Sequence, residues 1–242
     1  MKANEQQGYN QDGFDRHIWS VTLFVLMSKA GIKPIAIPAW SRQIGCMDTR
    51  EIVEQGSGAL PAVINTLALA FQDDPAFAWI LPDADIRRAR LPAIFKFMAQ
   101  EDFIAGSVLH SPGMEVATLW RAPGRHRETP MGAVRTPLTY LAVLRSAVGR
   151  GDAVGKSMAA HHPAGRHHYL RFAGVLPQMQ GKGWGGVAIR AGIQRAEADG
   201  LPIYLETATH SNVGLYQRFG FEVTAQWDVP GGGPHFWAMT RG

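Results

Sequence analysis

The chain places three alternating glycines between a strand-forming run and a run with helical periodicity. Gly181, Gly183 and Gly185 follow an apolar stretch over residues 169–176, and from residue 187 apolar side chains recur every three to four positions. The glycines therefore stand where a helix is expected to begin. A helix N-terminus offers unpartnered amides and a partial positive charge, and glycine lets an anion approach the backbone closely. The segment predicts a phosphate-binding turn.

A second block of regularly spaced residues follows downstream. Residues 202–207 predict a short buried strand, and residues 211–219 predict a short helix that Gly220 ends in a left-handed conformation. Asn212 and Tyr216 are four residues apart and share a face of that helix. A phenol titrates at about pH 10, so a neutral tyrosine can donate a proton at physiological pH.

The two blocks resemble the signatures of one enzyme family. Gln-x-x-Gly-x-Gly at residues 180–185 resembles the diphosphate-binding motif of the Gcn5-related N-acetyltransferase (GNAT) superfamily. Asn-x-x-x-Tyr at residues 212–216, with Gly-Phe at residues 220–221, resembles the second signature of that superfamily. The branch that includes puromycin N-acetyltransferase is similar in four further runs, residues 167–175, 205–207, 230–234 and 237–241. The resemblance implies acetyl-coenzyme A (acetyl-CoA) as cosubstrate.

The resemblance also implies roles for individual residues. Cofactor binding is expected from Val175, Gln180, Gly181, Lys182, Gly183, Trp184, Gly185, Gly186 and Asn212. Tyr216 is expected to protonate the departing thiolate, and the Val175 amide is expected to polarise the thioester carbonyl. In this family two parallel strands diverge beside the position of Val175 and admit the pantetheine arm of the cofactor. Gly174 would permit a bulge in the strand at this point.

Direct acyl transfer also requires a group that takes a proton from the amine, because an amine with a pKa near ~10 is protonated at neutral pH. Glu206, at the end of a predicted strand, is the first candidate for this base. His167 and His168 compete for the role, and at most one can face the site because adjacent strand residues point to opposite faces. Asp73 and Asp74 either attract a cationic acceptor or end the helix that precedes them.

These residues require a scaffold in which strands and helices alternate. The strand at residues 169–176, the helix after the glycines and the strand at residues 202–207 predict a right-handed crossover between parallel strands. Further elements are predicted as helices over residues 59–71 and 86–103 and as hairpins over residues 107–121 and 222–241. The expected fold class is mixed α/β, with a mostly antiparallel sheet, one parallel pair and flanking helices.

The composition excludes several classes of protein. A chain of 242 residues with 46% hydrophobic residues can bury a sizeable core, and its net charge of +4 is scattered, which does not indicate nucleic-acid binding. The longest apolar stretch, residues 18–27, is too short to span a bilayer, and no signal-peptide cleavage pattern follows it. The single cysteine, Cys46, is typical of a reducing compartment, so a cytoplasmic location is expected.

Two domains of unequal character are predicted. Residues 1–46 are expected to form a partly disordered N-terminal extension, and residues 47–242 are expected to form the N-acetyltransferase domain. No spacing of cysteine and histidine indicates a metal site. The protein is expected to be a monomer or a homodimer, with neither nucleic acid nor membrane as partner.

The sequence therefore predicts an enzyme that moves an acetyl group from acetyl-CoA directly to the primary amine of a small molecule. Two alternatives stay open. In one, the acceptor is an amine of a protein or peptide. In the other, the chain is a non-catalytic acyl-CoA-binding module that keeps the phosphate turn without turnover.

Overall fold

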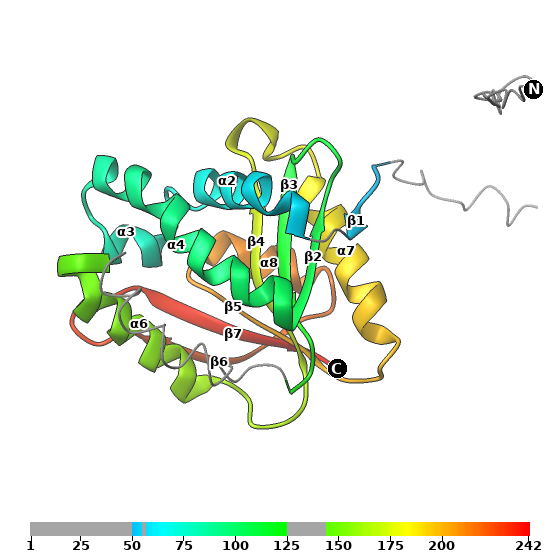
Figure 1. The fold of residues 1–242 in the computed structure, drawn as a ribbon. Coiled ribbons are helices and arrows are strands. Elements are labelled where there is room, and N and C mark those ends of the chain that lie inside the picture. Colours follow the sequence, from blue (N-terminus) through cyan, green and yellow to red (C-terminus); the bar gives the residue numbers. More distant parts are fainter. Residues whose placement is uncertain (1–49, 55–56, 125–143) are drawn as a thin grey trace, which may run out of the picture. The chain divides into compact units, whose positions relative to one another are not determined.

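The computed structural model describes residues 50–54, 57–124 and 144–242, which are coloured in Figure 1. They belong to one compact unit that spans Asp48–Gly242. The predicted extension over residues 1–46, including Cys46, lies outside the described residues.

The described residues form a seven-stranded sheet with the strand order β1-β2-β3-β4-β5-β7-β6. The strands are β1 (Val53–Glu54), β2 (Gly106–His110), β3 (Val116–Arg121), β4 (His168–Val175), β5 (Ile203–Thr207), β6 (Glu222–Asp228) and β7 (His235–Arg241). Neighbouring strands are antiparallel except β4 and β5, which are parallel. The prediction of a mixed sheet with one parallel pair is confirmed.

Four of the six α-helices in the described residues were predicted from the periodicity of the sequence, whereas those over Pro75–Ile80 and Val148–His161 were not. They are α2 (Leu60–Ala70), α3 (Pro75–Ile80), α4 (Ala84–Ala105), α6 (Val148–His161), α7 (Trp184–Glu197) and α8 (His210–Gln217), with short 3-10 turns η2 (Ser57–Ala59), η3 (Arg145–Ala147) and η4 (Pro177–Met179). The helices predicted over residues 59–71 and 86–103 are confirmed as α2 and α4. The final helix begins one residue earlier than predicted, at His210, and Gly220 beyond it has the expected positive φ of 79°.

Two apolar clusters hold these helices against the sheet. One cluster joins α2, α3, α4 and α6 to the strands and includes Leu67, Phe95 and Leu119. The other joins α7 and α8 to the strands and includes Ile189 and Tyr216. Figure 1 shows α2 and α4 in front of β3 and β4. Burial of apolar side chains in both clusters fixes the position of every element that contributes to the site described below.

The parallel strands β4 and β5 separate along their length. Their residue pairs are confined to the start of each strand, where His168 pairs with Ile203 and Tyr169 pairs with Tyr204. Beyond that point β4 stays paired with β3 as far as Val175, and β5 stays paired with β7 through its last residue. A gap therefore separates the carboxyl halves of β4 and β5.

The irregularity in β4 lies away from the position that the sequence suggested. The register between β3 and β4 shifts between Leu119 and Trp120, which leaves Arg171 as the extra residue on β4. Gly174 pairs regularly with Ala117, so the predicted bulge at this glycine is wrong. A Cβ at Gly174 would lie 2.9 Å from side-chain atoms of α2, so this glycine is required by the close packing of α2 on the sheet.

Candidate active site

The glycine-rich turn has the predicted geometry. Gly181 and Gly183 have φ angles of 73° and 85°, in the left-handed region that favours glycine, and α7 begins at the next residue, Trp184. The Gln180 side-chain amide donates a hydrogen bond of 3.3 Å to the Val175 carbonyl, which ties the turn to the end of β4. The turn therefore presents the N-terminus of a 14-residue helix beside the gap between β4 and β5.

Arg50 contacts this turn, and the sequence analysis did not identify it. Its guanidinium donates a hydrogen bond to the Lys182 carbonyl and lies 5.4 Å from the ring centroid of Trp184. A Cβ at Gly183 would lie 2.9 Å from Arg50 Nη1. Because Gly183 has no side chain, the guanidinium of Arg50 can pack against the turn, although Arg50 lies more than a hundred residues upstream.

The strand geometry directs the Val175 amide toward the gap. The Leu176 N–H donates to the Glu115 carbonyl on the β3 side, and successive N–H groups along a strand point to opposite sides. The N–H of Val175 therefore points toward the β5 side, where no residue pair joins the two strands. This orientation agrees with the predicted role of Val175 as a donor to a bound carbonyl.

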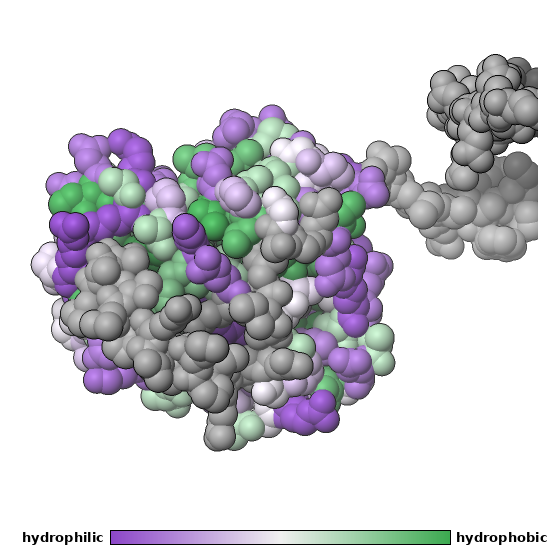
Figure 2. Space-filling view, in the orientation of Figure 1, coloured by the Kyte–Doolittle hydropathy of each residue, from purple (hydrophilic) through white to green (hydrophobic). Residues whose placement is uncertain are grey.

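A cavity of about 1220 Å³ adjoins the same gap. Its wall is formed by α3, α4, α6, residues 169–173 of β4, the carboxyl end of β5, and α8, and it includes Asp74, His162, Glu206, Asn212 and Tyr216. The residues of the glycine-rich turn are not part of this wall. On the molecular face drawn in Figure 2, apolar side chains gather over α2 and are bordered by polar ones.

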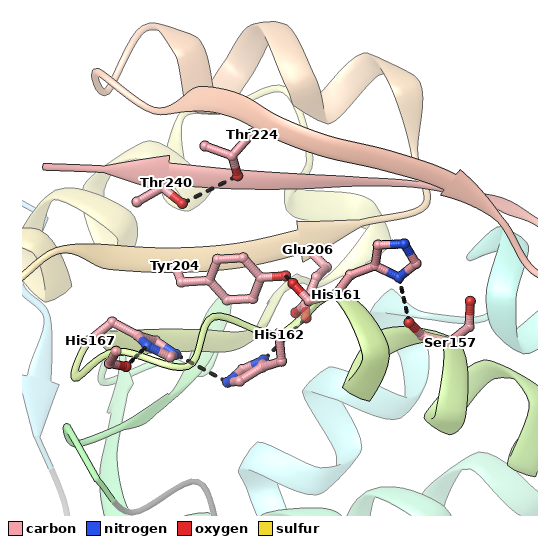
Figure 3. A network of polar contacts seen from close by, with 9 residues as sticks. Ser157, His161, His162, His167, Tyr204, Glu206, Thr224 and Thr240 are labelled. Atoms are coloured by element: carbon pink, nitrogen blue, oxygen red, sulfur yellow. Dashed lines mark hydrogen bonds and ion pairs between the residues drawn. The ribbon is translucent and has the colours of Figure 1, made fainter.

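Glu206 is buried in the cavity wall. Its side chain is 1% exposed, Oε1 lies 3.5 Å from His162 Nδ1, and Oε2 has no hydrogen-bond partner among the described residues. Figure 3 shows Glu206 and Tyr204, both from β5, beside His161 and His162 at the end of α6. Burial, followed by the charge of Glu206, raises the pKa values of Tyr169 and Tyr204, so both phenols stay neutral beside the carboxylate.

The two candidate histidines separate as the strand alternation predicts. The His168 ring points away from the cavity, where Nε2 lies 2.9 Å from Asp199 Oδ2. His167 is buried, and its Nε2 lies 3.0 Å from Nε2 of His162. His162 was not identified from the sequence, because it lies at the end of α6 and no motif includes it.

Tyr216 and Asn212 both line the cavity, as their shared helix face predicts. Burial raises the pKa of Tyr216 to about 12, so its phenol stays protonated at physiological pH. The Asn212 side-chain amide donates a long hydrogen bond of 3.5 Å to Thr207 Oγ1, which connects α8 to the end of β5. The Tyr216 phenol and the Glu206 carboxylate thus share one cavity.

Asp73 and Asp74 differ in position. Asp73 is exposed and does not line the cavity, whereas Asp74 lines it and caps α3 by accepting hydrogen bonds from the N–H groups of Ala76 and Phe77. Burial raises the pKa of Asp74 above its usual value, and the two backbone hydrogen bonds oppose that shift. Asp74 therefore places a second carboxylate in the cavity wall, besides its role as a helix cap.

Within the described residues, no group of three or more histidine, cysteine, aspartate or glutamate side chains is arranged to hold a metal ion. None of the described helices combines the length and the apolar character that crossing a bilayer requires.

Comparisons with known proteins identify the family. The model of the acetyltransferase (GNAT) family matches residues 110–221, which include β3, β4, the glycine-rich turn and α8. A protein of Schizosaccharomyces pombe named uncharacterized N-acetyltransferase C550.08 is 26% identical over 167 residues, covering 64% of this chain and 68% of that protein.

Solved structures of acetyltransferases share the fold. A histone acetyltransferase HPA2-related acetyltransferase from Corynebacterium glutamicum has a TM-score of 0.61 at 24% identity, covering 79% of this chain and 95% of that chain. Arylalkylamine N-acetyltransferase 2 from Aedes aegypti has a TM-score of 0.52 at 12% identity, and the match covers 80% of this chain and 99% of that chain. These structures show the shared fold, and the family match together with the sequence similarity of the Schizosaccharomyces pombe protein leads to one conclusion: the chain belongs to the GNAT family of acetyltransferases and is an acyltransferase.

Proposed function

We propose that this acyltransferase moves an acetyl group from acetyl-CoA directly to the primary amine of a small molecule. The observation that carries the proposal is that Glu206 and Tyr216, from β5 and α8, line one cavity beside the gap between β4 and β5. A thioester lying in this gap has a proton acceptor and a proton donor within the same cavity. Both groups are required when an ammonium becomes an amide and a thiolate leaves.

The cofactor is held in this proposal by the turn and the start of α7. The N–H groups of residues 180–186 bind the diphosphate, and the positive φ angles of Gly181 and Gly183 allow the backbone to curve around it. Positive charge at the turn comes from Lys182 and Arg50, and an aromatic surface comes from Trp184. Asn212 lies further along, where the pantetheine arm reaches the cavity.

The chemistry then proceeds in one transfer step. Glu206 takes a proton from the acceptor ammonium, and the neutral amine attacks the thioester carbonyl while the Val175 N–H stabilises the developing negative charge on its oxygen. As the bond from carbon to sulfur breaks, the nitrogen loses its second proton to solvent and Tyr216 donates its phenolic proton to the departing thiolate. The products are an N-acetyl compound and coenzyme A, and solvent then returns a proton to Tyr216 and takes one from Glu206.

The cavity wall supports a small acceptor with an apolar body. Aromatic and aliphatic side chains make up much of the wall, among them Phe71, Phe77, Ile80, Met98, Met158 and Phe172. Asp74 and Glu206 supply carboxylates that attract an ammonium group. The name of the Aedes aegypti relative, an arylalkylamine N-acetyltransferase, supports an acceptor of this kind.

A thiol-release assay tests the proposal. Purified full-length protein is incubated with acetyl-CoA and with panels of small apolar amines, polar amines and peptides. Turnover with the apolar amines supports the proposal, and turnover with peptides alone supports the alternative of a protein or peptide acceptor. Calorimetric binding of acetyl-CoA without turnover on any panel supports a non-catalytic module.

The branch of the family, the location in the cell and the oligomeric state stay predictions. Assignment to the puromycin N-acetyltransferase branch is tested by including puromycin among the acceptors. A cytoplasmic location is tested by cell fractionation. A monomeric or homodimeric state is tested by light scattering of the full chain.

A further inference from the structure

We propose that His162 is a positioning residue for the general base, and that His167 fixes the His162 imidazole so that its Nδ1 shares a proton with Glu206. The proposal rests on the proposed function, because it explains how a buried carboxylate is kept ready to accept a proton from the amine. Its first experimental readout is independent of that function.

His167 carries its ring hydrogen on Nδ1. Its Nδ1 lies 2.7 Å from the Gly165 carbonyl oxygen. A carbonyl oxygen only accepts hydrogen bonds, so Nδ1 of His167 must carry the hydrogen. Burial lowers the pKa of His167 below its usual value, which favours the neutral ring. In a neutral ring that is protonated at Nδ1, Nε2 is an acceptor.

The hydrogen on His167 in turn fixes the proton on His162. Nε2 of His162 lies 3.0 Å from Nε2 of His167, a normal hydrogen-bond distance. Because the nitrogen of His167 accepts, the nitrogen of His162 must donate. His162 therefore carries a hydrogen on Nε2, and its remaining ring nitrogen, Nδ1, faces Glu206 (Figure 3).

The contact between His162 and Glu206 depends on a proton that the two share. A neutral His162 with its hydrogen on Nε2 has a lone pair on Nδ1, and this lone pair would face the lone pairs of an ionised carboxylate at 3.5 Å. Two acceptors at this distance repel each other, so the contact is favourable only when the pair holds a proton. The pair then exists as imidazolium with carboxylate or as imidazole with carboxylic acid.

The surroundings of the pair favour a fixed ring orientation. The ring of His162 makes edge contacts with Tyr169 and Tyr204, each at a centroid distance of 5.0 Å. The two tyrosines come from β4 and β5, and their raised pKa values keep them neutral. Of the described residues, His162 is the ion-pair partner of Glu206. An imidazolium there stabilises the ionised carboxylate, which the reaction requires.

The proton balance of the step follows from this arrangement. The ammonium of the acceptor gives one proton to Oε2 of Glu206, the oxygen that has no hydrogen-bond partner among the described residues. Oε1 stays in contact with His162, which keeps its own proton. The acceptor becomes a neutral amine, and the carboxylate becomes a carboxylic acid that later loses its proton to solvent.

Nitrogen-15 NMR of the histidine rings tests the geometry in the enzyme without substrate. The expected spectrum shows His167 protonated at Nδ1 and His162 protonated at Nε2, with assignments from His162→Gln and His167→Gln. Because no turnover is involved, this result is independent of the proposed function. If His167 is protonated only at Nε2, the proposal is overturned.

Rate measurements test the consequence for Glu206. His162→Gln is expected to lower kcat about tenfold at neutral pH, because Glu206 then lacks the imidazole that faces Oε1. The KM for acetyl-CoA is expected to stay unchanged. His161→Gln is the matched control, because His161 is the adjacent residue, is exposed and does not line the cavity.

A pair of substitutions at His167 separates positioning from packing. His167→Gln keeps an acceptor for the His162 Nε2–H, whereas His167→Leu keeps only the volume. His167→Leu is expected to lower kcat as His162→Gln does, with the KM for acetyl-CoA unchanged, and His167→Gln is expected to restore most of the wild-type kcat. Equal kcat values for the two variants would overturn the proposal. If the wild type binds acetyl-CoA and never turns over, the proposed function fails, and the NMR result still decides the geometry.

Discussion

Val175 and Thr207 are the last residues of two neighbouring parallel strands that share residue pairs only at their opposite ends. The two residues stand on either side of a gap that adjoins both the glycine-rich turn and the cavity. Because β4 and β5 are held by β3 and β7 on their outer sides, the separation is built into the sheet. It is the opening through which we propose that the thioester reaches the acceptor.

Tyr216→Phe tests the proton donor. The variant keeps the ring that packs 5.9 Å from Phe221 and removes only the hydroxyl group. We expect kcat to fall by about 10², the lower end of general acid catalysis, with the KM for acetyl-CoA retained. Steady-state thiol release at several acetyl-CoA concentrations measures both constants. An unchanged rate across the pH range would remove Tyr216 from the mechanism.

The raised pKa of Tyr216 adds a prediction about alkaline stability. Burial raises it to about 12 in the folded chain, from an ordinary value of 10.0. When the pH lies between these two pKa values, the unfolded chain has lost the phenolic proton and the folded chain still holds it. The group therefore contributes its full stabilisation below the pKa of the unfolded chain, and this contribution is lost as pH rises toward the pKa of the folded chain. Denaturant unfolding should show a smaller loss of stability over this interval in Tyr216→Phe than in the wild type.

Gly183→Ala tests the phosphate turn. Alanine at a φ of 85° costs about 1–2 kcal/mol of backbone strain, and its Cβ would lie 2.9 Å from Arg50 Nη1. We expect the affinity for acetyl-CoA to fall at least about tenfold in calorimetry. Gly200→Ala is the matched control, because Gly200 also has a positive φ, of 62°, but has open space around its Cβ position. Equal affinities in the two variants would contradict a special role for the turn.

Glu206→Gln tests the proton acceptor with a side chain of the same shape. The amide cannot take up the proton of the amine, so kcat/KM for the acceptor should fall by about 10² or more. The residual rate should rise with pH, because solvent deprotonates more of the amine at high pH. Glu222→Gln, at an exposed position on β6, should behave as the wild type. A flat pH response of the residual rate would argue against the assignment.

Asp74→Asn separates recognition of the acceptor from helix capping. Asparagine caps helices about as well as aspartate, so α3 should be retained. Burial raises the pKa of Asp74, so its ionised form is disfavoured in the folded chain, and loss of the charge should not reduce stability at neutral pH. The KM for a cationic amine should rise about fivefold to tenfold if Asp74 attracts the acceptor.

Asp83 provides the control for that experiment. It caps α4 in the same way, accepting hydrogen bonds from the N–H groups of Asp85 and Ile86, but it is exposed and does not line the cavity. Asp83→Asn should therefore leave the KM for the amine unchanged. A similar rise in both variants would point to a general effect of surface charge.

Local features of the sequence were sufficient for several predictions. The glycines of the turn require positive φ angles, and the residues on both sides of them have clear strand and helix patterns, so the turn was predictable from one short segment. Asn212 and Tyr216 share a helix face because helical geometry fixes the relation of residues four apart. Alternation along a strand likewise separated His167 from His168 before any contact was known.

The sequence by itself determined the fold class, the position of the glycine-rich turn and the choice of Glu206 and Tyr216 as candidates, because each follows from spacing within one or two adjacent elements. Only the tertiary structure placed His162 against Glu206 and Arg50 against the turn, since these residues are far from their partners in the chain and belong to no motif. Contacts between distant segments depend on how apolar faces pack, and that packing is a property of the whole fold.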